Sequence, residues 1–265
     1  MYTRFQLAKK YLHYYLTASN GKGHGIHSPF VFDFIKNVLR DQKEYDHYHM
    51  IEKGRQKLLK QSAEIEVEDP GAGSAVIKTK KRVVADMARS SLKPAKYAQL
   101  LYRMVNYYKP QTILELGTSF GITTSYLATA NALAKVYTIE GSSAIAEIAE
   151  KTFSRLDLKN IELMKGNFDN TLPSLLTKLN SIDFAFIDGN HRKEPTLNYF
   201  QQLLNHSTPS TILIFDDIHW SAGMEAAWTE IKQHPTVTLT IDLFFIGIVF
   251  FNPDINHKQQ FSIRF

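Results

Sequence analysis

The chain has 265 residues, of which 44% are hydrophobic and 22% charged, so its composition is that of a globular protein and excludes wholesale disorder. The absence of cysteine excludes disulfides, thiolate metal sites and cysteine nucleophiles. The longest apolar run, Leu243–Phe251, is too short to span a membrane, and the first residues lack the continuous apolar stretch of a secretory signal. We therefore expect a cytoplasmic protein with no membrane partner.

The net charge of +5 is unevenly distributed along the chain. Residues 1–110 carry 20 Lys and Arg against 10 Asp and Glu, whereas residues 111–265 carry 11 against 16. A basic segment joined to an acidic body could bind nucleic acid or attract an anionic substrate. Because no run of like charges reaches five or six residues, a solvated basic surface is favoured and a nucleic-acid partner is not expected.

The N-terminal part of the sequence predicts helices. Apolar residues recur at helical spacing in residues 5–16, and Ser28-Pro29 is typical of a helix start that opens residues 30–39. Glycines interrupt the chain at residues 21–25. We expect residues 1–90 to form a helical cap that closes as a lid over the substrate, and residues 91–265 to form the body.

The boundary between cap and body falls in residues 62–85. An acidic stretch there is followed by Pro70-Gly71-Ala72-Gly73-Ser74 and then by a basic stretch. This glycine-containing string resembles a nucleotide-binding loop, but charged residues follow it where such a loop is followed by an apolar helix. We interpret the string as a mobile loop or a chance match.

Helices and strands alternate from residue 92 onward, with short connections. Such alternation predicts an α/β fold in which helices cover both faces of a parallel sheet. The last two strands are too close together for a helical crossover and should pair antiparallel. We therefore expect a Rossmann-like, doubly wound, seven-stranded sheet, mostly parallel with an antiparallel last strand. The predicted strands are residues 112–116, 135–139, 161–164, 182–187, 211–215, 237–242 and 246–251.

Ligands of open parallel sheets bind beyond the carboxyl ends of the strands. Two glycines, Gly117 and Gly121, follow the first strand, but their spacing is not the GxGxxG of nicotinamide dinucleotide enzymes. Glu140 stands at the end of the second strand, and the residues before it are largely apolar. An acid at this position can accept hydrogen bonds from both hydroxyls of a ribose. Asn167 and Phe168 follow the third strand and suit a purine.

Three aspartates follow the next two strands. Asp188 ends the fourth strand, and Asp216 and Asp217 end the fifth. Carboxylates that converge repel one another unless a cation lies between them, and oxygen ligands favour Mg²⁺ or Ca²⁺ over zinc. The alternative is that they cap the next helices, although a cap needs only one residue per helix.

Residues 111–265 resemble the class I S-adenosylmethionine-dependent methyltransferases, and among them the metal-dependent O-methyltransferases of the catechol and sugar type. The run ILELGTSFGITTSYLA, residues 113–128, matches the first motif of that group, and VYTIEGS, residues 136–142, matches the second. The whole chain, including residues 25–30, also resembles bacterial members of this superfamily. The resemblance implies that Gly117, Ser119 and Thr123 hold the methionine part of the cofactor and that Glu140 holds its ribose. It also implies that Asn167 and Phe168 lie beside the adenine. The other residues expected at the cofactor are Glu115, Gly121 and Asp188.

The resemblance also places Asp188, Asp216 and Asp217 at the metal positions. The Asp216-Asp217 pair is closer to the sugar type, because the catechol type usually has Asp-Asn. Catechol-type enzymes place a lysine, the general base, three residues after the first metal aspartate, and here that position is His191. Histidine can perform the same function, or it could only cap a helix or support Asp188. His219 and Trp220 could line the acceptor pocket or pack in the core.

These features predict an S-adenosylmethionine-dependent methyltransferase that uses a divalent metal, Mg²⁺ or Ca²⁺, to methylate a hydroxyl of a small-molecule acceptor. Asp188 and His191 are the expected catalytic residues. Two alternatives stay open: a nicotinamide-dependent oxidoreductase with the same type of sheet, and a non-catalytic relative that binds S-adenosylmethionine. A nucleic-acid methyltransferase is disfavoured because the Asn/Asp-Pro-Pro-Tyr/Phe motif is absent. A homodimer is left open.

Overall fold

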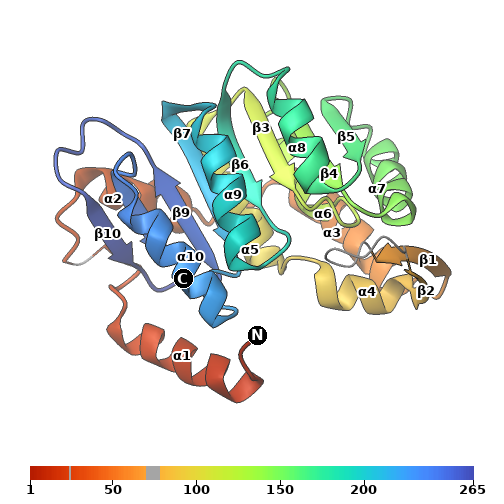
Figure 1. Cartoon of the computed structure of the whole chain (residues 1–265), viewed down its shortest axis with the longest axis horizontal. Helices are drawn as coiled ribbons and strands as arrows, with labels where there is room; N and C mark the ends of the chain where they lie inside the picture. The colour runs from red at the N-terminus through yellow and green to blue at the C-terminus, as the bar shows by residue number, and fades with distance from the viewer. Residues whose placement is uncertain (24, 70–77) are drawn as a thin grey trace. The chain divides into compact units, whose positions relative to one another are not determined.

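The computed structural model describes residues 1–23, 25–69 and 78–265 (Figure 1). The string at residues 70–74 that resembles a nucleotide loop lies outside the described residues. Within the part of the chain that is described, no helix is both long enough and apolar enough to cross a membrane.

The described residues form two compact units. The first unit comprises residues 1–41 and 179–265, and the second unit comprises residues 42–178. Residues of the expected cap, 1–90, therefore belong partly to the first unit and partly to the second. That these residues act together as a lid stays a prediction.

The second unit begins with two helices separated by a hairpin. The hairpin strands pair antiparallel, with Glu66 opposite Lys81 and Ile65 opposite Arg82. This hairpin was not predicted, although residues 64–67 alternate acidic and apolar side chains as a strand does. Its two strands are acidic and basic, and opposite charges across a strand pair are favourable. The elements are α3 (Asp46–Leu59), β1 (Glu64–Asp69), β2 (Lys78–Val83) and α4 (Val84–Ser91).

Three parallel strands in the order β3-β4-β5 form the sheet of the second unit. Helices connect them, because parallel neighbours need a crossover. Helix α6 packs against α3, α5 and β4, and all residues from Ile122 to Ala128 are buried. The elements are α5 (Ala95–Tyr108), β3 (Thr112–Leu116), α6 (Ile122–Ala130), β4 (Lys135–Glu140), α7 (Ser143–Arg155), β5 (Ile161–Lys165) and α8 (Phe168–Leu176).

The sheet of the first unit has the strand order β10-β8-β9-β7-β6. Strand β9 is antiparallel to both β7 and β8, whereas the pairs β6–β7 and β8–β10 are parallel. The predicted antiparallel pairing of residues 237–242 with residues 246–251 is therefore confirmed. Helices α9 and α10 pack side by side (Figure 1). The elements are β6 (Ile182–Ile187), α9 (Lys193–Leu204), β7 (Ser207–Asp216), α10 (Ala222–Gln233), β8 (Leu239–Asp242), β9 (Ile246–Phe250) and β10 (Gln259–Ser262).

The mixed α/β class with mostly parallel strands is confirmed. Among the described residues, and apart from the β1-β2 hairpin, the strands number eight rather than the predicted seven. The additional strand, β10, has the sequence QQFS and contains a single apolar residue. Neither an apolar run nor a clear alternation marks so short an edge strand, so the sequence pattern could not predict it.

The N-terminal helices are also confirmed. Helix α1 (Arg4–Thr17) starts with a capping box in which Thr3 and Gln6 exchange hydrogen bonds. Helix α2 (Pro29–Phe34) continues as the π-helical turn η1 (Ile35–Leu39). The buried Tyr14 attaches α1 to the C-terminal strands, because its hydroxyl donates to the carbonyl of Ile263 and its ring lies 5.3 Å from that of Phe244.

Candidate active site

The loop between β3 and α6 turns sharply enough to bring its backbone to the end of the sheet. Gly117, Ser119 and Gly121 all have positive φ, at 105°, 49° and 78°. At Gly121 a Cβ would lie 2.5 Å from the Phe153 ring, so only glycine lets the start of α6 approach α7. The N–H groups of Gly117, Ser119 and Gly121 donate to Ile139, Glu140 and Thr118, so internal hydrogen bonds fix the path of this loop at the start of the buried helix.

Glu140, at the end of β4, closes this loop from the neighbouring strand. Its Oε2 accepts a hydrogen bond from Ser119 N at 2.9 Å, and its Oε1 accepts one from Ser142 N at 3.0 Å. Burial raises the pKa of Glu140, and the backbone N–H groups around it only partly oppose this. Each carboxylate oxygen can accept a second hydrogen bond, so Glu140 keeps acceptor capacity for a diol.

Glu115 lies beneath the loop and is fully buried. Its Oε2 accepts hydrogen bonds from the hydroxyls of Thr124 at 2.5 Å and Thr138 at 2.7 Å, and Thr138 also contacts the loop hydroxyl of Thr118 at 2.6 Å. Burial raises the pKa of Glu115 to about 7, against the lowering effect of the two threonines. This placement lets Glu115 support the loop from within the core.

The other predicted cofactor residues lie near the same strand ends. Thr123 is in the first turn of α6 and is buried. Asn167 caps α8 by accepting a hydrogen bond from Asp169 N at 2.9 Å, and the half-buried Phe168 begins that helix. The Gly166 N–H donates to the Glu140 carbonyl at 2.9 Å, which joins this segment to the end of β4.

In the first unit, the ends of β6 and β7 bring three polar side chains together. Asp188, His191 and Asp216 each offer one ligand atom, and these atoms all lie within 4.8 Å of one another. Ile187 and Phe215 are paired in the parallel register, so the aspartates that follow them lie at neighbouring strand ends. His191 Nε2 lies 3.7 Å from Asp188 Oδ1. Two carboxylates and an imidazole at this separation form a donor set for a divalent cation.

Asp217 is placed differently from the other two predicted metal aspartates. Its ligand atoms are not part of that three-residue group. Its backbone is in the left-handed region, with φ of 53°, and its N–H donates to the Phe245 carbonyl at 2.7 Å. The group therefore contains His191, which the sequence suggested as a base, and Asp217 as a metal ligand stays a prediction.

His219 lies between two carboxylates that the sequence analysis did not identify. Its Nδ1 is 3.0 Å from Glu225 Oε1 and its Nε2 is 2.8 Å from Asp242 Oδ2. Burial lowers the pKa of His219, but hydrogen bonds and charges from Asp242 and Glu225 raise it overall. Asp242 could have been found from the sequence, because it ends a strand as the other acids do. Glu225 carries no such signal.

Known methyltransferases match part of this chain, and the family match includes the loop after β3, Glu140, Asp188 and Asp216. A family described as a methyltransferase domain matches residues 114–218. A catechol O-methyltransferase of Niastella koreensis is 32% identical over 141 residues, which are 51% of this chain and 61% of that protein. The matched segment thus spans less than two thirds of this relative.

Solved structures extend the likeness to most of the chain. An O-methyltransferase of Bacillus cereus in complex with S-adenosylhomocysteine has a TM-score of 0.57 at 21% identity, covering 83% of this chain and 97% of that chain. A Podospora anserina methyltransferase bound to S-adenosylhomocysteine has a TM-score of 0.58 at 13% identity, covering 85% and 97%. The fold is therefore that of these two methyltransferases. Residues 114–218 match a methyltransferase domain, and the resemblance to O-methyltransferases is confirmed.

Proposed function

We propose that this protein is an S-adenosylmethionine-dependent O-methyltransferase that methylates a hydroxyl of a small molecule with the help of a divalent cation. The observation that carries the proposal is the glycine loop after β3, closed by the Glu140 carboxylate through the Ser119 N–H. This loop lies in the segment that matches the methyltransferase domain, and the solved relatives of the same fold contain S-adenosylhomocysteine.

In this proposal the second unit binds the cofactor. Backbone groups of Gly117 and Ser119 and the side chain of Thr123 would hold the methionine part. Glu140 would accept the ribose hydroxyls, since its oxygens have lone pairs beyond those used by Ser119 and Ser142. The half-buried Phe168 offers an apolar face for the adenine, and Asn167 offers an amide.

The residues of the first unit fit a divalent cation. Asp188, His191 and Asp216 present two oxygens and one nitrogen within 4.8 Å of one another. We assign Asp188 and Asp216 to a cation such as Mg²⁺ or Ca²⁺, and we keep Asp217, the next residue in the chain, as a further proposed ligand. When bound, the cation supplies positive charge that lowers the pKa of an acceptor hydroxyl.

The chemistry requires only a few further steps from this chain. S-adenosylmethionine supplies a sulfonium methyl group. We assign to His191 the removal of the hydroxyl proton at Nε2, so that the acceptor oxygen forms its bond to the methyl carbon as the carbon–sulfur bond breaks. The products are the methyl ether, S-adenosylhomocysteine and a protonated His191. Most of the rate would come from orientation of the two reactants.

The test is the identity of the bound cofactor followed by an assay for transfer. Mass spectrometry of the purified protein, or calorimetry with added compounds, should detect binding of S-adenosylmethionine or S-adenosylhomocysteine and not of NAD. Methyl transfer across a panel of hydroxylated acceptors should then depend on a divalent metal. Binding of NAD would support the oxidoreductase instead, and cofactor binding without transfer to any acceptor would support a non-catalytic relative.

A cytoplasmic location, a homodimer and the absence of nucleic-acid and membrane partners stay predictions from the sequence. Fractionation of cells that express the tagged chain and sedimentation of the purified protein would test them.

A further inference from the structure

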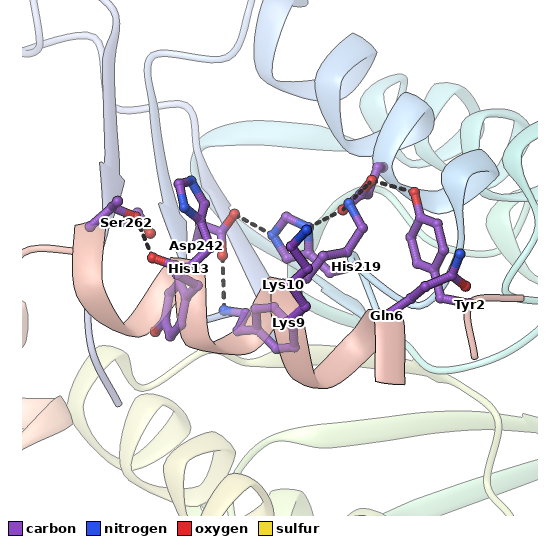
Figure 2. Close-up of a pocket in the computed structure, with 12 residues that line it drawn as sticks. Tyr2, Gln6, Lys9, Lys10, His13, His219, Asp242 and Ser262 are labelled. Carbon is purple, nitrogen blue, oxygen red and sulfur yellow. Dashed lines mark hydrogen bonds and ion pairs between the residues drawn. The ribbon is translucent and has the colours of Figure 1, made fainter. Parts of the chain in front are cut away.

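A cavity of about 530 Å³ lies in the first unit between α1 and the C-terminal strands. Figure 2 shows residues of α1, among them Lys9 and His13, together with His219 and Asp242 around this cavity. The cavity contains none of the residues assigned above to the cofactor or the cation. Its charges and its position indicate what it could bind.

The carboxylates of this cavity are fully engaged by the chain itself. Glu225 accepts hydrogen bonds from the Tyr2 hydroxyl at 2.7 Å and from Lys10 Nζ at 3.0 Å. Asp242 accepts from Trp228 Nε1 at 3.2 Å, and both acids contact His219. Because these donors already occupy both carboxylates, and Lys10 adds a positive charge beside Glu225, the acids do not prevent an anion from entering.

Two further donors remain on the α1 wall. Lys9 and His13 line the cavity, and they lie on the same helix face because they are four residues apart. Among the described residues, no side-chain hydrogen bond or ion pair is found for either of them. An ammonium group and an imidazole N–H on one wall of a cavity can both donate to a carboxylate.

The interior between these donors is aromatic. Tyr14 and Phe244 are both buried, their ring centroids are 5.3 Å apart, and His219 stacks on Phe244 at 5.1 Å. Such walls favour a flat ring. The cavity therefore combines an aromatic interior with a cationic rim, which suits a ring that carries an acid.

The strand register relates this cavity to the proposed cation site of the same unit. Asp242 pairs with Gly247 across β8 and β9, and Gly247 pairs with Phe215 across β9 and β7. Asp242 is thus two strands, or about 10 Å, from the residue that precedes Asp216. Asp242 lines the cavity, so the cavity lies at the same edge of the sheet as the proposed cation site.

We propose that this cavity binds the acceptor, and that the acceptor is a hydroxylated aromatic carboxylate. Its carboxylate binds Lys9 and His13, its ring lies against Phe244 and Tyr14, and its hydroxyl points toward Asp188 and Asp216. This assignment rests on the proposed function, but binding in the cavity can be measured without transfer.

The experiment uses a matched pair of probes, 3-(3,4-dihydroxyphenyl)propanoate and its neutral primary amide. Calorimetry measures the binding of each probe to the full chain, and a methyl-transfer assay with S-adenosylmethionine measures kcat/KM. The variants are Lys9→Gln, Lys9→Arg and the control Arg4→Gln, which is exposed on the same helix and does not line the cavity. In the wild type the acid should bind about tenfold more tightly than the amide, through one charge-assisted contact.

Lys9→Gln should reduce this preference to about threefold or less, whereas Lys9→Arg and Arg4→Gln should keep it. Equal binding of acid and amide by the wild type, or binding of neither at millimolar concentration, overturns the assignment. If the acid binds in a Lys9-dependent way but no probe is methylated, the cavity assignment stands and the proposed function fails. Transfer that is equal for acid and amide leaves the proposed function and overturns the cavity assignment.

Discussion

The two units hold their carboxylates in different ways. In the second unit, Glu140 is bound by backbone N–H groups and Glu115 by threonine hydroxyls, so neither depends on a charged partner. In the first unit, Glu225 and Asp242 share His219; Glu225 also binds Tyr2 and Lys10 from the start of the chain, and Asp242 also binds Trp228. The first arrangement joins elements that follow one another in the chain, from β3 to β4, whereas the second requires α1 to pack against elements more than 200 residues away.

This difference suggests a division of function that mutations can test. The backbone N–H groups that bind Glu140 are fixed in direction and hold its carboxylate in one orientation, which suits a cofactor that does not vary. Side chains that titrate or coordinate suit a cation and an acceptor. Substitutions in the first unit should therefore affect transfer, and substitutions in the second unit should affect cofactor binding and stability.

The largest effect is expected from Asp216→Ala in the first unit. Loss of a ligand to the cation should lower methyl transfer by about 10³-fold or more, because the charge that stabilises the developing oxyanion is lost. The affinity for S-adenosylhomocysteine should stay within about tenfold of the wild type. A transfer assay, with and without chelator, and calorimetry measure the two quantities. Asp254→Ala, at an exposed position of the same unit, is the control. Full activity in chelator would mean that these aspartates only cap helices.

His191→Ala should lower the transfer rate by roughly 10²- to 10⁴-fold if His191 is the general base. Metal affinity should persist. Titration with Mn²⁺ in a calorimeter measures the metal affinity, with the exposed His257→Ala as the control. Loss of metal binding in His191→Ala would instead make His191 a ligand, in agreement with its place beside Asp188 and Asp216.

Glu115 should make the stability of the second unit depend on pH. Its pKa is raised from 4.5 to about 7, so the folded state binds this proton more tightly than the unfolded state does. The contribution of Glu115 to the free energy of unfolding is therefore largest below pH 4.5. It falls as the pH rises through 7, by about 3 kcal/mol in total.

The measurement is urea unfolding of the wild type and of Glu115→Gln at pH 5 and pH 8. The wild type should lose about 2.5 kcal/mol more than the variant between these two pH values, because glutamine does not ionise and part of the total loss has already occurred at pH 5. Glu147→Gln, at an exposed position of α7, should follow the wild type. If the free energy of unfolding changed equally with pH in the wild type and in Glu115→Gln, ionisation of Glu115 would not destabilise the folded state.

Glu140→Ala should weaken binding of S-adenosylhomocysteine by about 1–3 kcal/mol, since hydrogen bonds to a charged acceptor are lost. Transfer at saturating cofactor should change less than it does in the first-unit variants. Calorimetry checks the affinity, and Glu147→Ala is the matched control on the same unit. An unchanged affinity in Glu140→Ala would remove the ribose assignment.

The smallest effect concerns the expected lid, residues 1–90, which crosses the division between the units. If these residues close together, hydrogen exchange should show protection that rises across all of them when cofactor and acceptor bind. A rise confined to residues 1–41 or to residues 42–90 would show that each unit responds separately. Protection in the free protein as high as that of the central strands would exclude a lid.

The sequence by itself determined the parts of this protein that depend on short stretches of chain. Alternating strands and helices predicted the fold class. The glycines and Glu140 predicted a tight loop at the ends of two strands, because positive φ and a strand-end acid are requirements of neighbouring residues. That this loop binds the cofactor stays a prediction. The aspartates Asp188 and Asp216 were found by the same reasoning, since parallel strands end at one edge.

Tertiary structure alone decided the rest. Strand β10 depends on its pairing with β8, and the sequence could not show that His191 lies with Asp188 and Asp216 while Asp217 turns toward Phe245. Tyr2 and Glu225 are 223 residues apart, and Lys10 and Glu225 are 215 apart. No local pattern records such pairs, because they arise when α1 packs against the C-terminal strands and brings its side chains to those of α10.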